Sequence, residues 1–88
     1  MNVEFRKTFE KDLRKLRDKT LLNKIRVTIE DVESAQTPDE ISNVKKLKGE
    51  AGYFRIRVGD YRIGLFLQED AVLFVRILHR REFYRYFP

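Results

Sequence analysis

The hydrophobic residues of this 88-residue chain change their spacing near Tyr53, and that change limits the folds open to it. Before it, apolar residues recur every three or four positions, as in Leu22, Ile25, Ile29 and Val32. This is the period of an amphipathic helix. From Tyr53 onward apolar and polar residues alternate, which is the period of a strand with one buried face. The pattern therefore predicts helices first and a β-meander after them, in an α+β fold.

The N-terminal half predicts one short strand and two helices. We expect a strand over Asn2–Phe5, a helix over residues 9–18 with Thr8 as its N-cap, and a second helix from Thr20 to Ala35. The short break between the helices predicts a helical hairpin. Thr37-Pro38-Asp39-Glu40 has the form of a capping box with Pro at the first helical position, so it predicts one more helical turn.

The C-terminal half predicts a loop, three strands and a tail. Lysines and two glycines in Val44–Gly52 indicate the loop. The expected strands are Tyr53–Val58, Tyr61–Leu67 and Ala71–Leu78, with tight turns at Gly59-Asp60 and Glu69-Asp70 and a charged, aromatic tail over His79–Phe87. The third strand is apolar on both faces, as is typical of a central strand. We expect a single domain over residues 1–88, with the N-terminal strand and helical hairpin packed on one face of an antiparallel β-meander.

The composition excludes several kinds of site. The chain has no cysteine and one histidine, which excludes disulfides, a thiolate nucleophile and a cysteine-based zinc site. The N-terminus lacks an apolar segment, and no apolar run could cross a membrane. We therefore expect a cytoplasmic protein with no metal, no cofactor and no membrane partner. The net charge of +5 and the sequence pI near 9.7 make polyanions or acidic proteins plausible partners.

The excess positive charge lies between residues 45 and 62. This segment contains Lys45, Lys46, Lys48, Arg55, Arg57 and Arg62 against only Glu50 and Asp60. Alternation places Arg55 and Arg57 on one strand face, and the tight turn brings Arg62 close to them. Like charges opposed across a sheet are destabilising by up to about 1 kcal/mol per pair, and the arginine fork suits phosphate. The pattern indicates a phosphate-binding face, and the simpler interpretation is a solvated strand.

His79 and Tyr84 are the two further candidates for chemistry. His79 is the only side chain here whose unperturbed charge changes near pH 7, and we expect it close to the three arginines. The simpler interpretation is an ordinary surface or core histidine. Tyr84 could be a weak acid or base, could stack on a nucleobase, or could simply close the core.

Taken together, these segments resemble the RelE/ParE superfamily of bacterial and archaeal toxins from toxin–antitoxin pairs. The resemblance covers nearly the whole chain, through Phe9–Leu16, Lys45–Gly49, Tyr53–Arg62 and His79–Arg85. It implies a RelE-like fold and a ribosome-dependent, metal-independent mRNA endonuclease that uses the RNA 2′-hydroxyl as nucleophile and inhibits translation. It also implies two partners, a cognate acidic antitoxin and mRNA in the ribosomal A site.

The resemblance suggests a role for each candidate residue. Arg57, Arg62 and Arg81 would bind the phosphate, His79 would transfer a proton, and Tyr84 would orient or stack the base at the cut. The RNA backbone would contact Lys45, Lys46, Lys48, Arg55 and Arg80. Some relatives have a glutamate base at the place of Lys45 and lysines at those of Arg55 and Arg57, so the identity of the general base stays open.

Three other functions fit the same sequence. The first is a ParE-like inhibitor of DNA gyrase without a nuclease centre. The second is a non-catalytic RNA-binding module, which the basic strand face alone would support. The third is a toxin that has lost its catalysis.

Overall fold

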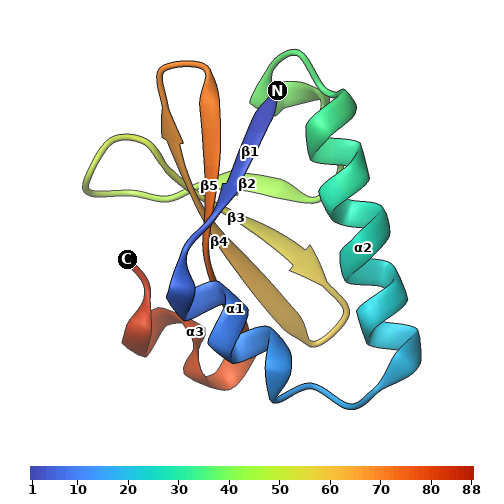
Figure 1. Cartoon of the computed structure of the whole chain (residues 1–88). Helices are drawn as coiled ribbons and strands as arrows, with labels where there is room; N and C mark the ends of the chain where they lie inside the picture. The colour runs from blue at the N-terminus through green and yellow to red at the C-terminus, as the bar shows by residue number, and fades with distance from the viewer.

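The computed structural model describes residues 1–88 and contains five strands and three α-helices. In chain order they are β1 (Asn2–Phe5), α1 (Lys7–Arg14), α2 (Lys19–Ser34), a 3-10 turn (Pro38–Glu40), β2 (Val44–Lys46), β3 (Tyr53–Val58), β4 (Tyr61–Gln68), β5 (Ala71–His79) and α3 (Arg80–Tyr86). Figure 1 shows the strands gathered in one sheet between α2 and α3. All three helices fall short of the length and apolar character that a membrane span requires.

The five strands are arranged in the order β1-β5-β4-β3-β2. The β3–β4–β5 meander is antiparallel, as the alternating pattern predicted. β1 pairs in parallel with β5, so the sheet as a whole is mixed rather than antiparallel. β5 has a strand neighbour on each side, which agrees with its apolar character on both faces.

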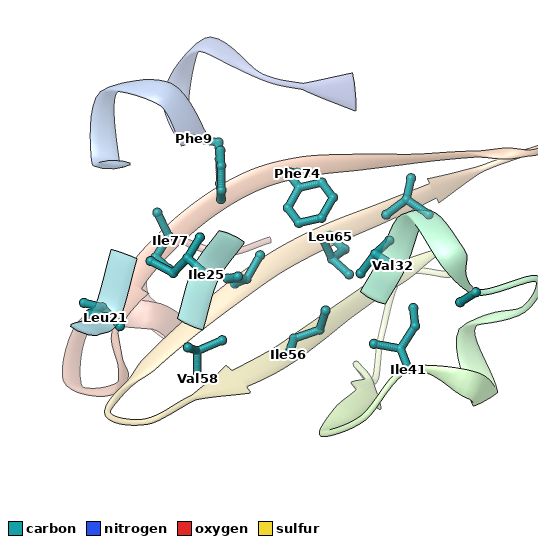
Figure 2. Close-up of a cluster of buried hydrophobic side chains, with 13 residues drawn as sticks. Phe9, Leu21, Ile25, Val32, Ile41, Ile56, Val58, Leu65, Phe74 and Ile77 are labelled. Atoms are coloured by element: carbon teal, nitrogen blue, oxygen red, sulfur yellow. The ribbon is translucent and has the colours of Figure 1, made fainter. Parts of the chain in front are cut away.

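The main core lies between the first two helices and one face of the sheet. Phe9 of α1 and Leu21, Ile25 and Val32 of α2 are buried there. They meet buried side chains from three strands, namely Ile56, Val58, Ile63, Leu65, Val72, Phe74 and Ile77 (Figure 2). Each fully buried side chain of this size contributes about 1.5–3 kcal/mol. The predicted α+β fold, with the two helices on one sheet face, is confirmed, and β1 joins the sheet itself beside β5.

Helix α1 begins and ends earlier than predicted. Its N-cap is Arg6, and the helix ends at Arg14 rather than at residue 18. The predicted cap was wrong because the Thr8 hydroxyl donates to the Val75 carbonyl oxygen of β5 at 2.6 Å. Asp18 belongs to the next helix instead, where its carboxylate accepts from the backbone N–H groups of Thr20 and Leu21.

The capping box before the 3-10 turn is confirmed. The Glu40 carboxylate accepts from the backbone N–H of Thr37 at 3.1 Å. The segment after it was wrongly predicted as a loop throughout. Val44–Lys46 forms β2, which pairs antiparallel with Phe54–Ile56 of β3. A three-residue edge strand is too short to show a periodic pattern in the sequence.

The charged tail was also wrongly predicted, because Arg80–Tyr86 forms helix α3. Phe83 and Phe87 are 0% and 3% exposed, so the segment is anchored by two apolar side chains. They lie on the sheet face opposite the main core. A Cβ added at Gly64 would approach the Phe87 ring to 2.7 Å, so the close contact requires glycine at that position. Tertiary packing, rather than local propensity, makes this short helix.

Candidate nucleic-acid interface

Three arginines and one lysine share the sheet face that α1 and α2 leave open. Arg57 of β3 lies directly opposite Arg62 of β4, and Arg55 lies opposite both Gly64 and Lys45 of β2. Paired residues of antiparallel strands point to the same side of a sheet. We call the surface formed by Lys45, Arg55, Arg57 and Arg62 the arginine face. The predicted gathering of the three arginines is confirmed.

The arginine face has no acidic partner. The chain contains two ion pairs, Arg26–Glu30 and Arg76–Asp12, and neither involves this surface. The Arg62 guanidinium donates to the carbonyl oxygens of Gly59 and Tyr61, at 3.0 and 2.9 Å. Arg55 donates to the Asn43 carbonyl oxygen, and its buried Nε has no partner. The positive charge is therefore held by the fold but not neutralised within it.

The pKa of Arg62 reflects both its burial and the neighbouring positive charges. Desolvation lowers the pKa of Arg62 below its ordinary value, and the charges of Arg55, Arg57 and Arg80 lower it further, while Tyr84 opposes them. A lowered pKa means that the charged guanidinium is less favourable here than in water. A bound phosphate would reverse that balance, because it would supply the missing negative charge.

Helix α3 adds two side chains beside the arginine face. Arg80 and Tyr84 are one turn apart and therefore share a flank of the helix, and both act on the pKa of Arg62. Tyr84 is 62% exposed and contacts Phe83 edge to face, so it does not close the core. Helical periodicity turns Arg81 away from the buried Phe83 side and into solvent. The Arg81 side chain thus points further from the sheet than that of Arg80.

His79 does not lie on the arginine face, and the expectation that it would was wrong. It pairs with Tyr61 and follows the alternation of Ile77, which points into the main core. Its ring meets the Tyr61 ring edge to face at 5.4 Å. Its Nδ1 accepts from the Arg81 backbone N–H at 3.2 Å, so the imidazole caps the start of α3. The register of β4 against β5 shifts at Val75, which has no partner on β4. Alternation after this bulge therefore places Ile77 and His79 on the face of Phe74.

The imidazole lines a polar hollow of about 470 Å³ at the end of the sheet. The hollow is also lined by Asp12, Lys15, Tyr61 and Glu82. The largest hollow, of about 680 Å³, lies elsewhere, against Met1, Glu33 and Asp70. None of the three arginines lines either hollow. A ligand on the arginine face would therefore be bound by an open surface.

The three candidate lysines are not placed together. Lys45 lies on the arginine face, whereas Lys46 pairs with Phe54 and lies on the core side of the edge strand. Lys48 is exposed in the loop that follows. Lys45 and Lys46 could not be separated from the sequence, because β2 was not predicted.

The chain matches known proteins over nearly its whole length. The family model of the ParE toxin of the type II toxin–antitoxin system parDE matches residues 3–84. Toxin RelE3 of Methanocaldococcus jannaschii is 40% identical over 89 aligned residues, which cover 100% of each chain.

Solved structures give the same result. A chain of the RelB-RelE antitoxin-toxin complex from Methanococcus jannaschii matches with a TM-score of 0.80 and 40% identity, over 96% of this chain and 98% of that one. A chain of the archaeal RelE-RelB complex from Pyrococcus horikoshii OT3 matches with a TM-score of 0.73 and 24% identity, over 90% and 93%, which supports the fold alone. With the fold, the family model and the relatives in agreement, the chain belongs to the RelE/ParE superfamily of toxins from type II toxin–antitoxin systems.

Proposed function

We propose that this toxin is an endoribonuclease that cuts mRNA in the ribosomal A site and thereby inhibits translation. The observation that carries the proposal is the pairing of Arg57 with Arg62, beside Arg55, without a carboxylate in reach. Such a surface is destabilising when empty. It becomes favourable when a phosphate accepts bidentate hydrogen bonds from the guanidinium groups. Of the common polyanions, RNA also carries its own nucleophile.

The proposed reaction uses the 2′-hydroxyl of the RNA. Its oxygen forms a bond to the adjacent phosphorus while the bond from phosphorus to the 5′-oxygen breaks. The 2′-proton passes to a base and a proton is delivered to the leaving 5′-oxygen, so no metal is required. Arg57 and Arg62 would stabilise the charge that develops on the phosphate, and removing one such donor typically lowers the rate by about 10²–10³-fold.

Helix α3 would supply the remaining contacts at the cut. Arg80 acts on the pKa of Arg62 from the neighbouring helix, so we assign it to the phosphate ahead of Arg81, which stays a candidate for the RNA backbone. The exposed ring of Tyr84 would stack on the base beside the cut, an interaction worth about 1–3 kcal/mol.

Proton transfer has two candidates. His79 would have to act through Nε2, since its Nδ1 is occupied by the Arg81 N–H. It would also require the RNA to pass around the end of the sheet, because the ring lies on the other side. The Tyr84 hydroxyl is the alternative, because Tyr84 is one of the groups that act on the pKa of Arg62. Either group would be expected to contribute about 10²–10⁴-fold.

The RNA backbone would be bound mainly through charge. Lys45 and Arg55 extend the arginine face toward the edge strand, and Lys48 continues it into the loop, with Lys46 close by on the other side of β2. Contacts of this kind give salt-dependent affinity with little sequence selectivity.

We further propose a cognate acidic antitoxin as the physiological partner. Relatives of this chain have been solved as RelB-RelE antitoxin-toxin complexes, one of them 40% identical to it. The net charge of +5 favours an acidic segment. It would cover part of the arginine face or the groove beside the helices.

The decisive experiment is induced expression followed by primer extension on a known transcript. Wild type should arrest growth and produce new 5′ ends within translated codons, whereas the double variant Arg57→Ala, Arg62→Ala should do neither. His79→Ala and Tyr84→Phe, tested singly, would show which group transfers the proton, because phenylalanine keeps the stacking ring and lacks the hydroxyl. The control variant is Arg26→Ala, which removes an arginine from the exposed side of α2. This variant should stay toxic.

The same cells separate the alternative functions. If the transcripts stay intact while plasmid supercoiling changes, the toxin is a gyrase inhibitor. If RNA is bound but neither readout changes, it is a binding module. Unchanged cleavage in the double arginine variant would exclude the proposed site.

A further inference from the structure

The outer edge of β5 is covered by a strand over only half its length. β1 pairs with Ala71–Phe74, so the backbone from Val75 onward has no strand neighbour on that side. Helix α1 supplies the missing partners through two side chains. The Thr8 hydroxyl donates to the Val75 carbonyl oxygen at 2.6 Å, and the Asp12 carboxylate accepts from the Ile77 N–H at 3.1 Å. Buried backbone groups require such partners.

Asp12 also binds a side chain of the same strand. It is the one charged residue among the buried residues, at 6% exposure. Its Oδ2 and Oδ1 accept from Nε and Nη2 of Arg76 at 2.8 and 3.1 Å. Hydrogen bonding to Asp12 raises the pKa of Arg76. With three hydrogen bonds on one carboxylate, Arg76 has little freedom to move.

Arg76 in turn contacts α3. Its guanidinium carbon lies 5.8 Å from the centre of the Tyr86 ring, within the range of a cation–π contact. The helix is also held by Phe83 and Phe87, which are buried against the sheet. Those two rings fix where α3 lies. The additional contact on the Tyr86 flank fixes its rotation about its own axis.

The rotation of α3 matters because its flanks are different. Successive residues of an α-helix are about 100° apart around its axis, so Tyr86 lies about 200° from Tyr84. The two rings therefore lie on opposite sides of the buried Phe83. Any rotation that frees Tyr86 from Arg76 also moves Tyr84 and Arg80 relative to Arg62.

We infer that Asp12 and Arg76 are positioning residues, which act through Tyr86 to orient α3 and so hold Arg80 and Tyr84 beside Arg57 and Arg62. The effect on cleavage rests on the proposed ribonuclease function. The effect on α3 does not.

The kinetic test compares Arg76→Met and Tyr86→Leu with wild type, in cleavage of mRNA on programmed ribosomes. Misplacement of reacting groups by about 1 Å can lower a rate about 100-fold, so we expect kcat to fall by about 10- to 100-fold. KM should change less than kcat, because Lys45 and Arg55, which bind the RNA backbone, are unchanged. Arg26→Met removes an exposed arginine of α2 and should leave both constants unchanged.

The second readout is hydrogen exchange of the α3 amides. We expect the Tyr84–Phe87 amides to exchange faster in both variants while those of α2 keep their wild-type rates. The double variant should be no worse than the more impaired single one, because both break the same contact. Tyr86→Leu leaves the Asp12–Arg76 pair intact, so it remains informative if Arg76→Met does not fold.

The possible outcomes are distinct. Equal acceleration of exchange in α2 and α3 would overturn the inference, since it indicates general loosening. Wild-type kcat together with wild-type α3 exchange would overturn it as well. If the wild-type toxin cuts no RNA, the proposed function fails, and the exchange experiment still decides how α3 is held.

Discussion

Arg62 and Arg76 lie on neighbouring strands, yet the fold treats them in opposite ways. Arg76 is matched to a buried carboxylate by two hydrogen bonds, and its pKa is raised. Arg62 donates only to carbonyl oxygens, and its pKa is lowered by desolvation and by the neighbouring arginines. The same side chain therefore forms a buried ion pair in one region and has no carboxylate partner in the other.

The difference follows from where each residue lies. Arg76 lies at a sheet edge that α1 closes, where a buried charge without a partner would be strongly destabilising. Gly64 of β4 pairs with Arg55 of β3 on one side and with Arg76 of β5 on the other. The Phe87 ring packs over Gly64 and so lies between the two arginines. On the far side of that ring the arginine face is open to water, which reduces the repulsion between its charges. A cationic surface can persist there without a carboxylate.

The largest expected effect concerns the buried Asp12–Arg76 ion pair. Asp12→Ala removes the carboxylate that Arg76 and the Ile77 N–H share, and should lower the free energy of unfolding by about 3–5 kcal/mol. Urea denaturation followed by circular dichroism measures this. Glu30→Gln breaks the exposed Arg26–Glu30 pair and should change stability by less than about 1 kcal/mol. Similar values for the two variants would contradict the contrast between a buried and an exposed pair.

An intermediate effect is expected for Arg62 of the arginine face. Arg62→Ala should lower the rate of message cleavage by about 10²–10³-fold while the melting temperature stays at or above that of wild type. A comparison of Arg80→Ala with Arg81→Ala sharpens the assignment, because Arg80 acts on the pKa of Arg62 while Arg81 points further from the buried Phe83 side of α3. A larger loss of cleavage in Arg81→Ala would show that α3 is oriented differently in the working complex.

The smallest effect concerns the cost of like charges. Arg57→Gln leaves Arg62 without its directly opposed charge and should raise the free energy of unfolding by up to about 1 kcal/mol. We expect a gain in stability because the pKa of Arg62 is lowered, which means that the folded state disfavours its charged form. Removing the neighbouring charge of Arg57 reduces this penalty. High salt should reduce the gain by screening. A loss of stability would mean that the arginine face is not repulsive.

The sequence by itself determined the α+β fold, the antiparallel meander and the gathering of Arg55, Arg57 and Arg62. Those features depend on local periodicity and on a two-residue turn, and both can be read from neighbouring residues. Alternation along one strand and a tight turn to the next are enough to place three side chains on one face.

Only the tertiary structure decided the position of the elements with no period of their own. β2 is too short to show alternation, and α3 is formed by the burial of Phe83 and Phe87. A bulge in β5, where the pairing with β4 skips Val75, turned His79 toward the core side, because one inserted residue reverses the face of the side chains that follow it. In the sequence Asp12 is one of several charged residues of α1, and only the half-covered edge of β5 makes it a buried partner of Arg76. Long-range contacts of this kind leave no local pattern in the sequence.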